Sequence, residues 1–531
     1  MRAIKFSKSI VLIALLVNNL AYCMSEINEP RHFPIIPTSM RRWWSSLGLP
    51  SLSTSNSVDG ESATILRSIE EKARARTEEE ELIEGRNYAL GQAESSLRKQ
   101  RGSTLVKAIF ERYFSREINV DELDKPADQW DHVVAQLTIA APVWYRITPE
   151  QIASIGQRFP NIRELTFVKI SLGDKGLQML SAQPFAGKLI KLSMRSARIT
   201  VEGVKASIGA FISLTSLDIS WNDMGDKVLA AIARAPFAGN LTKLNIEGPL
   251  VTDEGVKASI GAFTSLTSLD ISFNPIGDEG LAAIARAPCA DNLTELNIEG
   301  VRVTTEGVQA NIGVFISLTI LNISANYIGD VGLAAIAQAS FAGKLTRLNI
   351  GCTNITGEGV EASIGAFTRL TSLDVTVNDI DDEALAALAR ESFAGNLTEL
   401  KIGATRITDK GVQASIGAFT RLTSLAIVIS DNIGDEGLAA IAGAPCAGNV
   451  TGLSVRETGI TGEGVQASIG AFTRLTSLDI SFNAIGDEGM AVIARQPYAS
   501  YLTLYASNAN ITTEWLRKHR NEFDAFWAIF C

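Results

Sequence analysis

Apolar and polar residues alternate in one short pattern that recurs along most of the chain. Each copy follows Leu-x-x-Leu-x-Leu-x-x-Asn-x-Ile with conservative changes, and the copy that begins at Leu214 is representative. The period of two in its middle is that of a β-strand, so Leu217 and Ile219 should point inward while Asp218 and Ser220 point outward. A turn and a short apolar helix should then return the chain to the next strand, parallel to the last.

The copies are spaced in pairs. The interval from residue 162 to 189 is 27 residues and that from 189 to 214 is 25 residues, and this alternation continues through most of the array. Units of this length and pattern are the signature of leucine-rich repeats. A weaker copy opens at Val134. We therefore expect residues 134–511 to form an α/β leucine-rich-repeat solenoid, a right-handed horseshoe with parallel strands on its concave face and short helices on its convex face.

Several residue types recur at fixed places in the units, and each has a structural explanation. Aspartates in one half of the pairs and threonines in the other stand where a helix N-cap is needed. The asparagine after each strand should satisfy backbone groups of the bend. The unit that begins at Leu422 has one extra residue, so Asp431 falls in the asparagine position and the turn should bulge. The aspartates are Asp226, Asp278, Asp330, Asp435 and Asp487; the threonines are Thr252, Thr304, Thr356, Thr408 and Thr461; the asparagines are Asn222, Asn274, Asn326, Asn378 and Asn483.

Two aromatic columns should fill the core. Phe211, Phe263, Phe315, Phe367, Phe419 and Phe472 precede one set of units, and Phe185, Phe237, Phe341, Phe393 and Tyr498 precede the other. Cys289 and Cys446 occupy places in the second column, where a small apolar side chain suits the core. At ~4.8 Å per strand these two cysteines are roughly 29 Å apart, which is too far for a disulfide.

The segments outside the array differ in composition. Residues 1–23 are expected to be a signal peptide, because basic residues precede a short apolar run and Ala21-Tyr22-Cys23 precedes the expected cleavage at Met24. Acylation of Cys23 in a lipobox is the alternative. Residues 24–60 read as a disordered linker, residues 61–133 as a charged helical region that caps the array or docks a partner helix, and residues 512–531 as a C-terminal capping helix that Thr512 or Thr513 begins.

Composition and charge narrow the classes of function. The 531 residues include 48 Lys and Arg against 58 Asp and Glu, and this acidic balance argues against nucleic acid as a partner. The three histidines His32, His132 and His519 are far apart in sequence, and the chain has no phosphate-binding loop, G-x-S-x-G or C-x-x-C. We therefore expect no enzymatic activity, no cofactor and no metal. After signal removal we also expect no transmembrane segment.

Two columns of outward-facing residues should line the concave face. The strand column is Asp218, Asn245, Asp270, Asn297, Asn322, Asn349, Asp374, Lys401, Ala426, Ser454 and Asp479. The bend column is Trp221, Gly248, Phe273, Gly300, Ala325, Cys352, Val377, Ala404, Ile429, Glu457 and Phe482. Calcium needs six to eight converging oxygens, so a hydrogen-bonding ladder is the favoured interpretation of the strand column.

The bend column is the better candidate for a binding surface. Large apolar groups recur on alternate units beside charged residues, which is the composition of an interface hot spot. The alternative is that each large group packs over the adjacent Gly or Ala. The predicted partner-binding residues are Trp221, Phe273, Val377, Ile429 and Phe482 of the bend column, with Asp218, Asp270, Asp374 and Asp479 of the strand column.

The segment Ile-Gly-Asp-Glu-Gly-Leu-Ala-Ala-Ile-Ala at residues 276–285 resembles the repeats of bacterial GALA-type leucine-rich-repeat proteins and the cysteine-containing repeats of F-box proteins. The resemblance implies substrate recognition for a ubiquitin ligase, in bacterial members after delivery into a host cell. No F-box is evident in the chain, where only Leu49-Pro50 offers its opening.

Together these patterns predict an exported recognition module, secreted, periplasmic or on the cell surface, that binds a protein on its concave face. The alternative function is a substrate-recognition adaptor of a host ubiquitin ligase.

Overall fold

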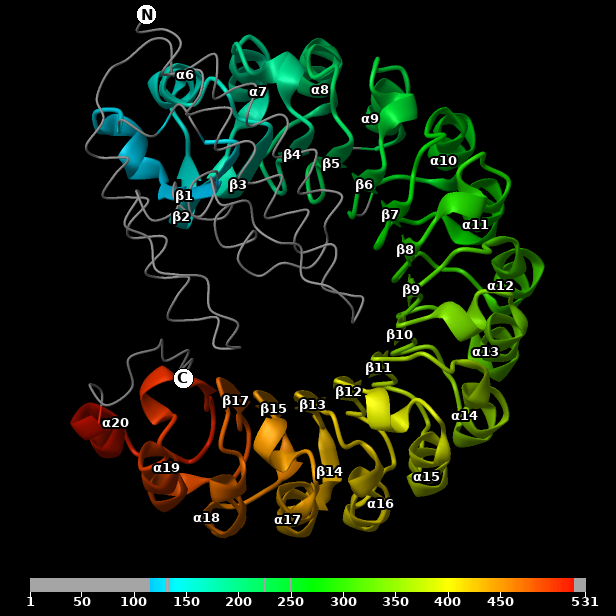
Figure 1. Ribbon diagram of the computed structural model, residues 1–531, viewed down its shortest axis with the longest axis vertical. Helices are drawn as coiled ribbons and strands as arrows, with labels where there is room; N and C mark the ends of the chain where they lie inside the picture. The colour runs from blue at the N-terminus through cyan, green and yellow to red at the C-terminus, as the bar shows by residue number, and fades with distance from the viewer. Residues whose placement is uncertain (1–114, 129–130, 132–133, 224, 249, 520–531) are drawn as a thin grey trace, which may run out of the picture. The chain divides into compact units, whose positions relative to one another are not determined.

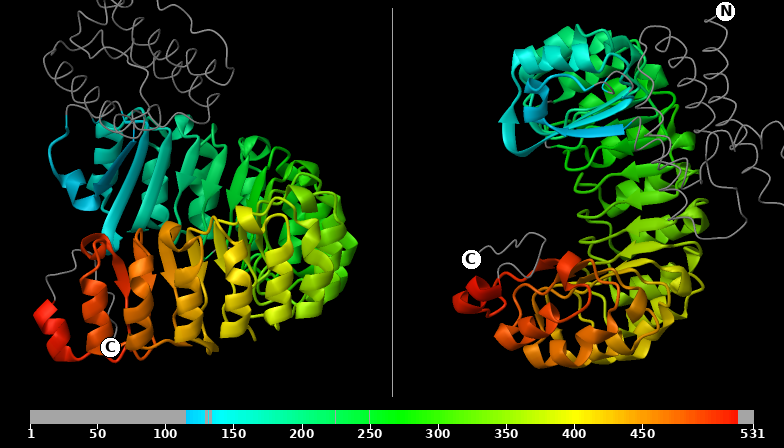
Figure 2. Two further views of the ribbon diagram at one scale, coloured as in Figure 1. Left: turned by 60° about the horizontal axis from the view of Figure 1, so that its bottom comes forward. Right: turned by 60° about the vertical axis from the view of Figure 1, so that its left-hand side comes forward.

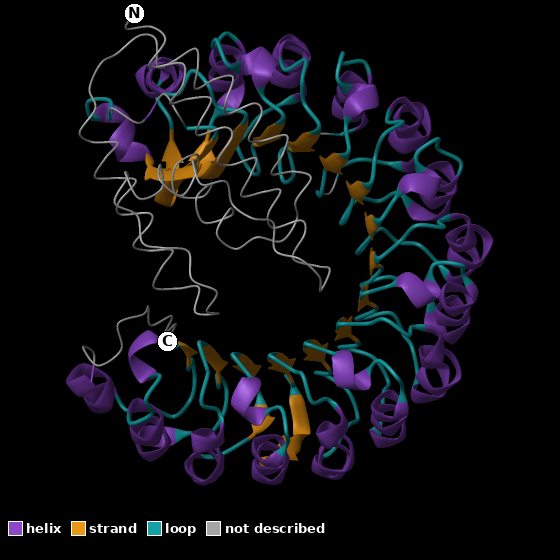
Figure 3. Ribbon diagram, viewed as in Figure 1, coloured by secondary structure: helices purple, strands orange, loops and turns teal. Residues whose placement is uncertain are grey.

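The computed structural model describes residues 115–519, apart from 129–130, 132–133, 224 and 249 (Figure 1). Nearly all of these residues belong to one compact unit, which holds the described residues from 118 to 131 and from 137 to 519. Within it, sixteen strands form one sheet in the order of the chain, and β14 and β16 form a separate pair. The strands line the inner wall of a curved array and the helices line its outer wall (Figure 3). This confirms the predicted solenoid.

The strands are short, because each unit contributes only a few residues to the sheet. They are β1 (Ser115–Asn119), β2 (Gln136–Arg146), β3 (Glu164–Ser171), β4 (Lys191–Ser193), β5 (Ser216–Asp218), β6 (Lys243–Asn245), β7 (Ser268–Asp270), β8 (Glu295–Asn297), β9 (Ile320–Asn322), β10 (Arg347–Asn349), β11 (Ser372–Asp374), β12 (Glu399–Lys401), β13 (Ser424–Ala426), β14 (Ser430–Gly434), β15 (Gly452–Ser454), β16 (Thr458–Gly459), β17 (Ser477–Asp479) and β18 (Thr503–Tyr505).

The helices alternate with the strands and stand side by side along the outer wall (Figure 2). They are α6 (Pro149–Arg158), α7 (Gly173–Ser181), α8 (Val201–Ser207), α9 (Asp226–Ala233), α10 (Asp253–Ser259), α11 (Gly277–Ala285), α12 (Thr305–Asn311), α13 (Gly329–Gln338), α14 (Gly357–Ser363), α15 (Asp382–Arg390), α16 (Asp409–Ser415), α17 (Asp435–Gly443), α18 (Gly462–Ser468), α19 (Gly486–Ala494) and α20 (Thr513–His519). Short 3-10 helices, such as η7 (Ile260–Ala262), lead into the next strand.

The parallel register places identical residues opposite one another. Leu217 pairs with Leu244, and Leu244 with Leu269, and all three side chains are buried. Both predicted aromatic columns are buried, and Cys289 and Cys446 are buried free thiols. Burial also raises the pKa of each of these thiols above its ordinary value. The core is therefore one continuous apolar spine between sheet and helices.

The threonine that follows the first leucine of the units forms a second ladder. Thr267 Oγ1 donates to the carbonyl oxygen of Thr242 at 3.2 Å, and Thr294 Oγ1 donates to that of Thr267 at 3.0 Å. The same bond repeats from unit to unit as far as Thr476. This ladder explains why Leu-Thr opens so many of the units.

The buried asparagines bridge neighbouring bends, as predicted. The side-chain amide of Asn326 donates to the carbonyl oxygens of Ile298 at 2.8 Å and Ile323 at 2.9 Å, and its oxygen accepts from the amide of Val303 at 3.1 Å. One amide group thus satisfies backbone groups of two consecutive units, which would otherwise be buried without partners.

The aspartates of the helices act differently from the prediction. Asp226 and Asp278 lie inside the first turn of α9 and α11, after the N-cap residue. The Asp278 carboxylate accepts from the backbone amide of Thr304 at 2.8 Å and from its hydroxyl at 2.7 Å, and Thr304 is the N-cap of the next helix. These aspartates therefore clamp one unit to the next, and of the two predicted sets only the threonines hold the N-cap position.

This clamp repeats along the array and explains a recurring glycine. Asp174, Asp226, Asp330, Asp382, Asp435 and Asp487 bind Thr200, Thr252, Thr356, Thr408, Thr461 and Thr512 in the same way. A Cβ atom at Gly307 would collide with the Asp278 carboxylate. The glycine is needed because the clamp approaches the helix so closely.

The unit that begins at Leu422 bulges, as predicted. Its extra residue extends the bend into β14, which pairs with β16 with a shift of register between Ser430 and Gly434. The prediction for the asparagine position was wrong in one respect, because Ser430 and not Asp431 directly follows the bend residue and is buried. The Ser430 hydroxyl has no hydrogen-bond partner among the described residues.

Both ends of the array extend beyond the regular units. β1 and β2 continue the sheet before the first regular strand, and β1 begins at Ser115, ahead of the predicted start of the array. At the other end the Thr512 hydroxyl accepts from the Trp515 amide at 3.1 Å, so Thr512 caps α20. The predicted signal peptide, the linker and most of the residue 61–133 region lie outside the described residues, as does the aromatic face after His519.

The clamp yields a prediction about Gly307. Gly307→Ala should lower the free energy of unfolding by ~1–3 kcal/mol through overpacking against Asp278, although helix propensity alone favours Ala by roughly 1 kcal/mol. Gly313→Ala is the control, because a Cβ there meets nothing within 4 Å. Urea unfolding should show that the loss disappears when Asp278 is also Ala. If Gly307→Ala still lowers the free energy of unfolding when Asp278 is Ala, the clamp is contradicted.

Candidate functional site

The bend column shares one unusual backbone conformation. Its members from Trp221 to Phe482, apart from Gly248, have φ between 50° and 61°, and Gly248 has φ 150°. A positive φ of this size is the left-handed region, which glycine and asparagine adopt most easily. The conformation turns the chain away from the strand and points the side chain out from the concave face.

Two members of the bend column are β-branched. Val377 has φ 57° and Ile429 has φ 54°. A β-branched residue in the left-handed region is a genuine outlier that costs about 1–2 kcal/mol relative to the right-handed conformation. Both side chains are nevertheless half exposed, at 51% and 53%. Packing within the chain does not account for residues of this size and shape at these positions.

The aromatic members lie partly on their neighbours. The rings of Trp221 and Phe273 are 6.1 Å apart between centroids and tilted by 41°, with Gly248 between them in the column. A Cβ at Gly300 would lie 3.1 Å from Cδ1 of Phe273, so that ring rests on the glycine. Both rings stay 40–44% exposed. The two interpretations of the column therefore hold together: the rings pack over glycine and still present an apolar surface.

Arginines accompany two of the aromatic rings. The guanidinium carbon of Arg195 lies 6.0 Å from the Trp221 ring centroid, and that of Arg456 lies 4.8 Å from the Phe482 centroid. Arg195 also forms an ion pair with Glu247 at 2.7 Å. Sequence reasoning missed both arginines. The signal was present, because each stands directly before the bend residue of the unit that precedes the ring.

The aspartates of the strand column brace their own strands. The Oδ1 atom of Asp270 accepts from the amide of Ser272 at 3.1 Å and from its hydroxyl at 2.6 Å. Asp218, Asp374 and Asp479 accept from the amide two residues later in the same way. This geometry agrees with the hydrogen-bonding ladder. Contact between these aspartates and a partner stays a prediction.

Asp270 of the strand column has a shifted pKa. Burial raises the pKa of Asp270 above its ordinary value and the Glu247 carboxylate adds to the rise, against hydrogen bonds from Ser272 and Asn297. Among the described residues no group of three or more His, Cys, Asp or Glu side chains is arranged to hold a metal ion. No described helix is long and apolar enough to cross a membrane.

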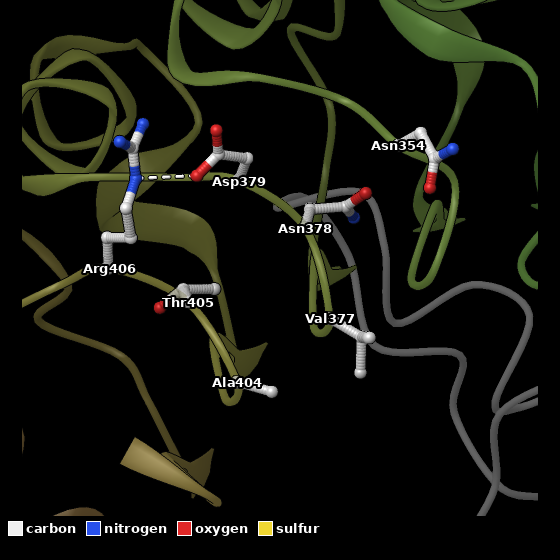
Figure 4. Close-up of a pocket in the computed structure, with 7 residues that line it drawn as sticks. All are labelled: Asn354, Val377, Asn378, Asp379, Ala404, Thr405 and Arg406. Atoms are coloured by element: carbon white, nitrogen blue, oxygen red, sulfur yellow. Dashed lines mark ion pairs between the residues drawn. The ribbon is translucent and has the colours of Figure 1, made fainter. Parts of the chain in front are cut away.

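A recess of about 440 Å³ opens beside the bend column, between the bends that follow β10, β11 and β12. Val377 and Ala404 form its apolar side, and the Arg406–Asp379 ion pair lies at its other end (Figure 4). That pair measures 2.5 Å, but both side chains are more than half exposed, so water screens it. Asn354, Asn378 and Thr405 complete the lining. The spacing of residues in the sequence gave no signal for this recess.

Comparison with known families agrees with this geometry. A family model described as "Leucine Rich repeat" matches residues 212–233, 264–285, 316–337, 344–362, 368–389 and 473–494. The chain carries leucine-rich repeats. The narrower resemblance to GALA-type repeats stays a prediction, because the match does not separate subfamilies.

Two curated proteins are similar to the leucine-rich-repeat array. Human NACHT, LRR and PYD domains-containing protein 12 is 26% identical over 308 residues, which covers 52% of this chain and 29% of the human protein. Mouse ribonuclease inhibitor is 25% identical over 371 residues, which covers 64% of this chain and 81% of the mouse protein. The chain thus spans less than a third of the length of the human relative.

Solved structures with a similar leucine-rich-repeat fold include the yeast Rad7 and Elc1 complex and an internalin, InlF, from Listeria monocytogenes. The yeast chain is 15% identical with a TM-score of 0.46, covering 86% of this chain and 100% of that chain. The internalin is 21% identical with a TM-score of 0.39, covering 68% of this chain and 88% of that chain.

The raised pKa of Asp270 yields a prediction about stability. A carboxyl whose folded pKa is raised ionises more easily in the unfolded chain, so its charge opposes folding above the ordinary pKa and not below it. Asp270→Asn should therefore raise the free energy of unfolding near pH 7 and change it little at about pH 3. Asparagine keeps the brace, because Asn322 accepts from the Ser324 amide at 3.1 Å in the equivalent place.

Urea titrations of the unmodified protein and of Asp270→Asn, near pH 7 and at about pH 3, give the free energies of unfolding to compare. Glu358→Gln, on the exposed surface of α14, is the control for the loss of one negative charge. An equal gain for the two variants near pH 7 would assign the effect to net charge and not to the site.

Proposed function

We propose that this leucine-rich-repeat chain is a non-enzymatic recognition protein whose bend column binds a protein partner. The observation that carries the proposal is the exposure of Val377 and Ile429 in left-handed backbone. Glycine fits this conformation with least strain, and it occupies the equivalent places at Gly248 and Gly300. Strain that is kept at exposed positions without a packing gain is typical of functional sites.

The surroundings suit a protein interface. Large apolar side chains on alternate units stand beside small ones, and charged groups of the strand column lie next to them, as in an apolar core with a polar rim. The recess next to Val377 offers a place for one anchoring side chain of the partner. A rigid stacked array can present such a row without reordering on binding, which lowers the entropic cost of association.

Export belongs to the same proposal. Its support is the basic and apolar character of residues 1–23 and the Ala21-Tyr22-Cys23 sequence before Met24. The ubiquitin-ligase adaptor stays a prediction that rests on the resemblance of the repeats. Most of residues 61–133, where an adaptor would hold the ligase, lie outside the described residues.

The decisive experiment replaces the strained residues with glycine. Val377→Gly combined with Ile429→Gly should abolish partner capture while leaving the free energy of unfolding unchanged or raising it by up to ~1 kcal/mol, because the backbone strain is relieved. The measurements are quantitative affinity capture with mass spectrometry, from culture medium and host lysate, and urea unfolding.

The matched control is Val331→Gly. Val331 is 52% exposed, almost the same as Val377, but it lies in α13 on the outer wall. A partner that both the unmodified protein and the control capture, but the double variant does not, is bound by the bend column. Capture that survives the double variant contradicts the proposal, and so does a marked loss of stability, which would mean that these side chains serve packing.

A further inference from the structure

The three aromatic rings of the bend column are not equivalent. Arg195 stands over Trp221 and Arg456 stands over Phe482, each from the position directly before the preceding unit's bend residue. A cation over an aromatic face is attracted by the ring's quadrupole. These two pairs therefore show how a guanidinium group is placed against an aromatic ring of the bend column.

At Phe273 the equivalent position holds the opposite charge. Glu247 directly precedes Gly248, the bend residue of the preceding unit. No arginine among the described residues stands over the Phe273 ring, which is 40% exposed. The third ring thus has the same backbone setting as the other two, with a carboxylate where they have a guanidinium.

Two carboxylates near this ring have no cationic partner in the described part of the chain. Arg195 pairs with Glu247, so that charge is compensated. Asp270 accepts from the Asn297 amide group at 3.0 Å, and Glu299 accepts from that of Asn322 at 2.9 Å, and neither forms an ion pair. Neutral amides leave each carboxylate with its full negative charge.

The side of Phe273 that faces the following units carries only small residues. The ring rests on Gly300, directly after Glu299, and the next member of the bend column is Ala325. A Cβ at Gly300 would already approach Phe273 Cδ1 to 3.1 Å, so a larger residue there would displace the ring. Neither residue places a large side chain on this side of the ring.

On the basis of the proposed protein recognition, we infer that the partner places an arginine side chain on Phe273, between Asp270 and Glu299. The planar guanidinium stacks on the ring, and its N–H groups donate to the Glu299 carboxylate in a charge-assisted pair. Lysine fits less well, because an ammonium group is a strongly hydrated point charge without a stacking face. Arginine at this place would make Phe273 a specificity-determining residue of the bend column.

The test uses the full chain and two labelled probes, a hexaarginine and a hexalysine peptide, in fluorescence anisotropy at low ionic strength. Phe273→Leu keeps an apolar side chain and removes the ring, and Glu299→Gln keeps the Asn322 contact and removes the charge. Each should weaken hexaarginine binding about fivefold, the range of one cation–π contact or one exposed charge pair. Hexalysine should bind more weakly to the unmodified chain.

Matched controls separate this place from the acidity of the whole chain. Tyr501→Leu removes an exposed aromatic ring in η16 (Ala499–Tyr501), outside the bend column, and Glu358→Gln removes a charge on the outer wall. Both should leave hexaarginine binding within about twofold. Equal losses for Glu299→Gln and Glu358→Gln, an unchanged affinity for Phe273→Leu, or equal binding of the two peptides would each overturn the arginine assignment.

The outcomes also separate this inference from the proposed function. Suppose that the glycine double variant loses partner capture but Phe273→Leu does not change the affinity for hexaarginine. The bend column then remains the binding surface, and the arginine contact is overturned. If the double variant captures partners as well as the unmodified protein does, the proposed function is overturned, regardless of the peptide affinities.

Discussion

The array depends on closing the hydrogen bonds of each bend with groups from the neighbouring unit. Backbone pairing between units continues past each three-residue strand to the bend residue, as when the Phe273 amide donates to the Glu299 carbonyl oxygen at 2.7 Å. Other carbonyl groups of the bend take their hydrogen bonds from a side chain. Asn326 shows the solution, since its amide reaches Ile298 in the preceding unit and Ile323 in its own. The Asp278 carboxylate does the same on the helical side through Thr304. Because both side chains bond to the neighbouring unit, the stability of each unit depends on its neighbours, as expected for a one-dimensional array.

That constraint creates the bend column. An inward asparagine after the strand requires the preceding residue to turn outward, and the left-handed conformation achieves this over very few residues. The side chain at this place can therefore vary from unit to unit. Gly248 and Gly300 satisfy the backbone alone. Trp221, Phe273 and Ile429 add apolar surface that the fold does not need, so the surface can diversify without disturbing the spine.

Much of this could be predicted from the sequence, because periodicity reports on burial. The inward leucines, both aromatic columns and the role of the asparagines follow from spacing alone. The aspartate clamp did not, since Asp278 stands where an N-cap is expected and only three-dimensional proximity reveals Thr304 of the next unit as its partner. Arg195 over Trp221 was also missed, although its position directly before the bend residue of the adjacent unit was a signal in the sequence. Spacing identifies which residues share a face, whereas contacts across units also depend on the curvature and tilt of the stack.

The unit that begins at Leu422 shows how far the constraint can be relaxed. Serine replaces asparagine after its bend, and the Ser430 hydroxyl is buried without a partner among the described residues. The extra residue lengthens the bend into β14, which pairs with β16 of the following unit. The bend residue of this unit is Ile429, one of the two strained β-branched members of the bend column. The scaffold of this unit thus departs from the regular pattern, and Ile429 still presents an exposed side chain from left-handed backbone at the same place as in the other units.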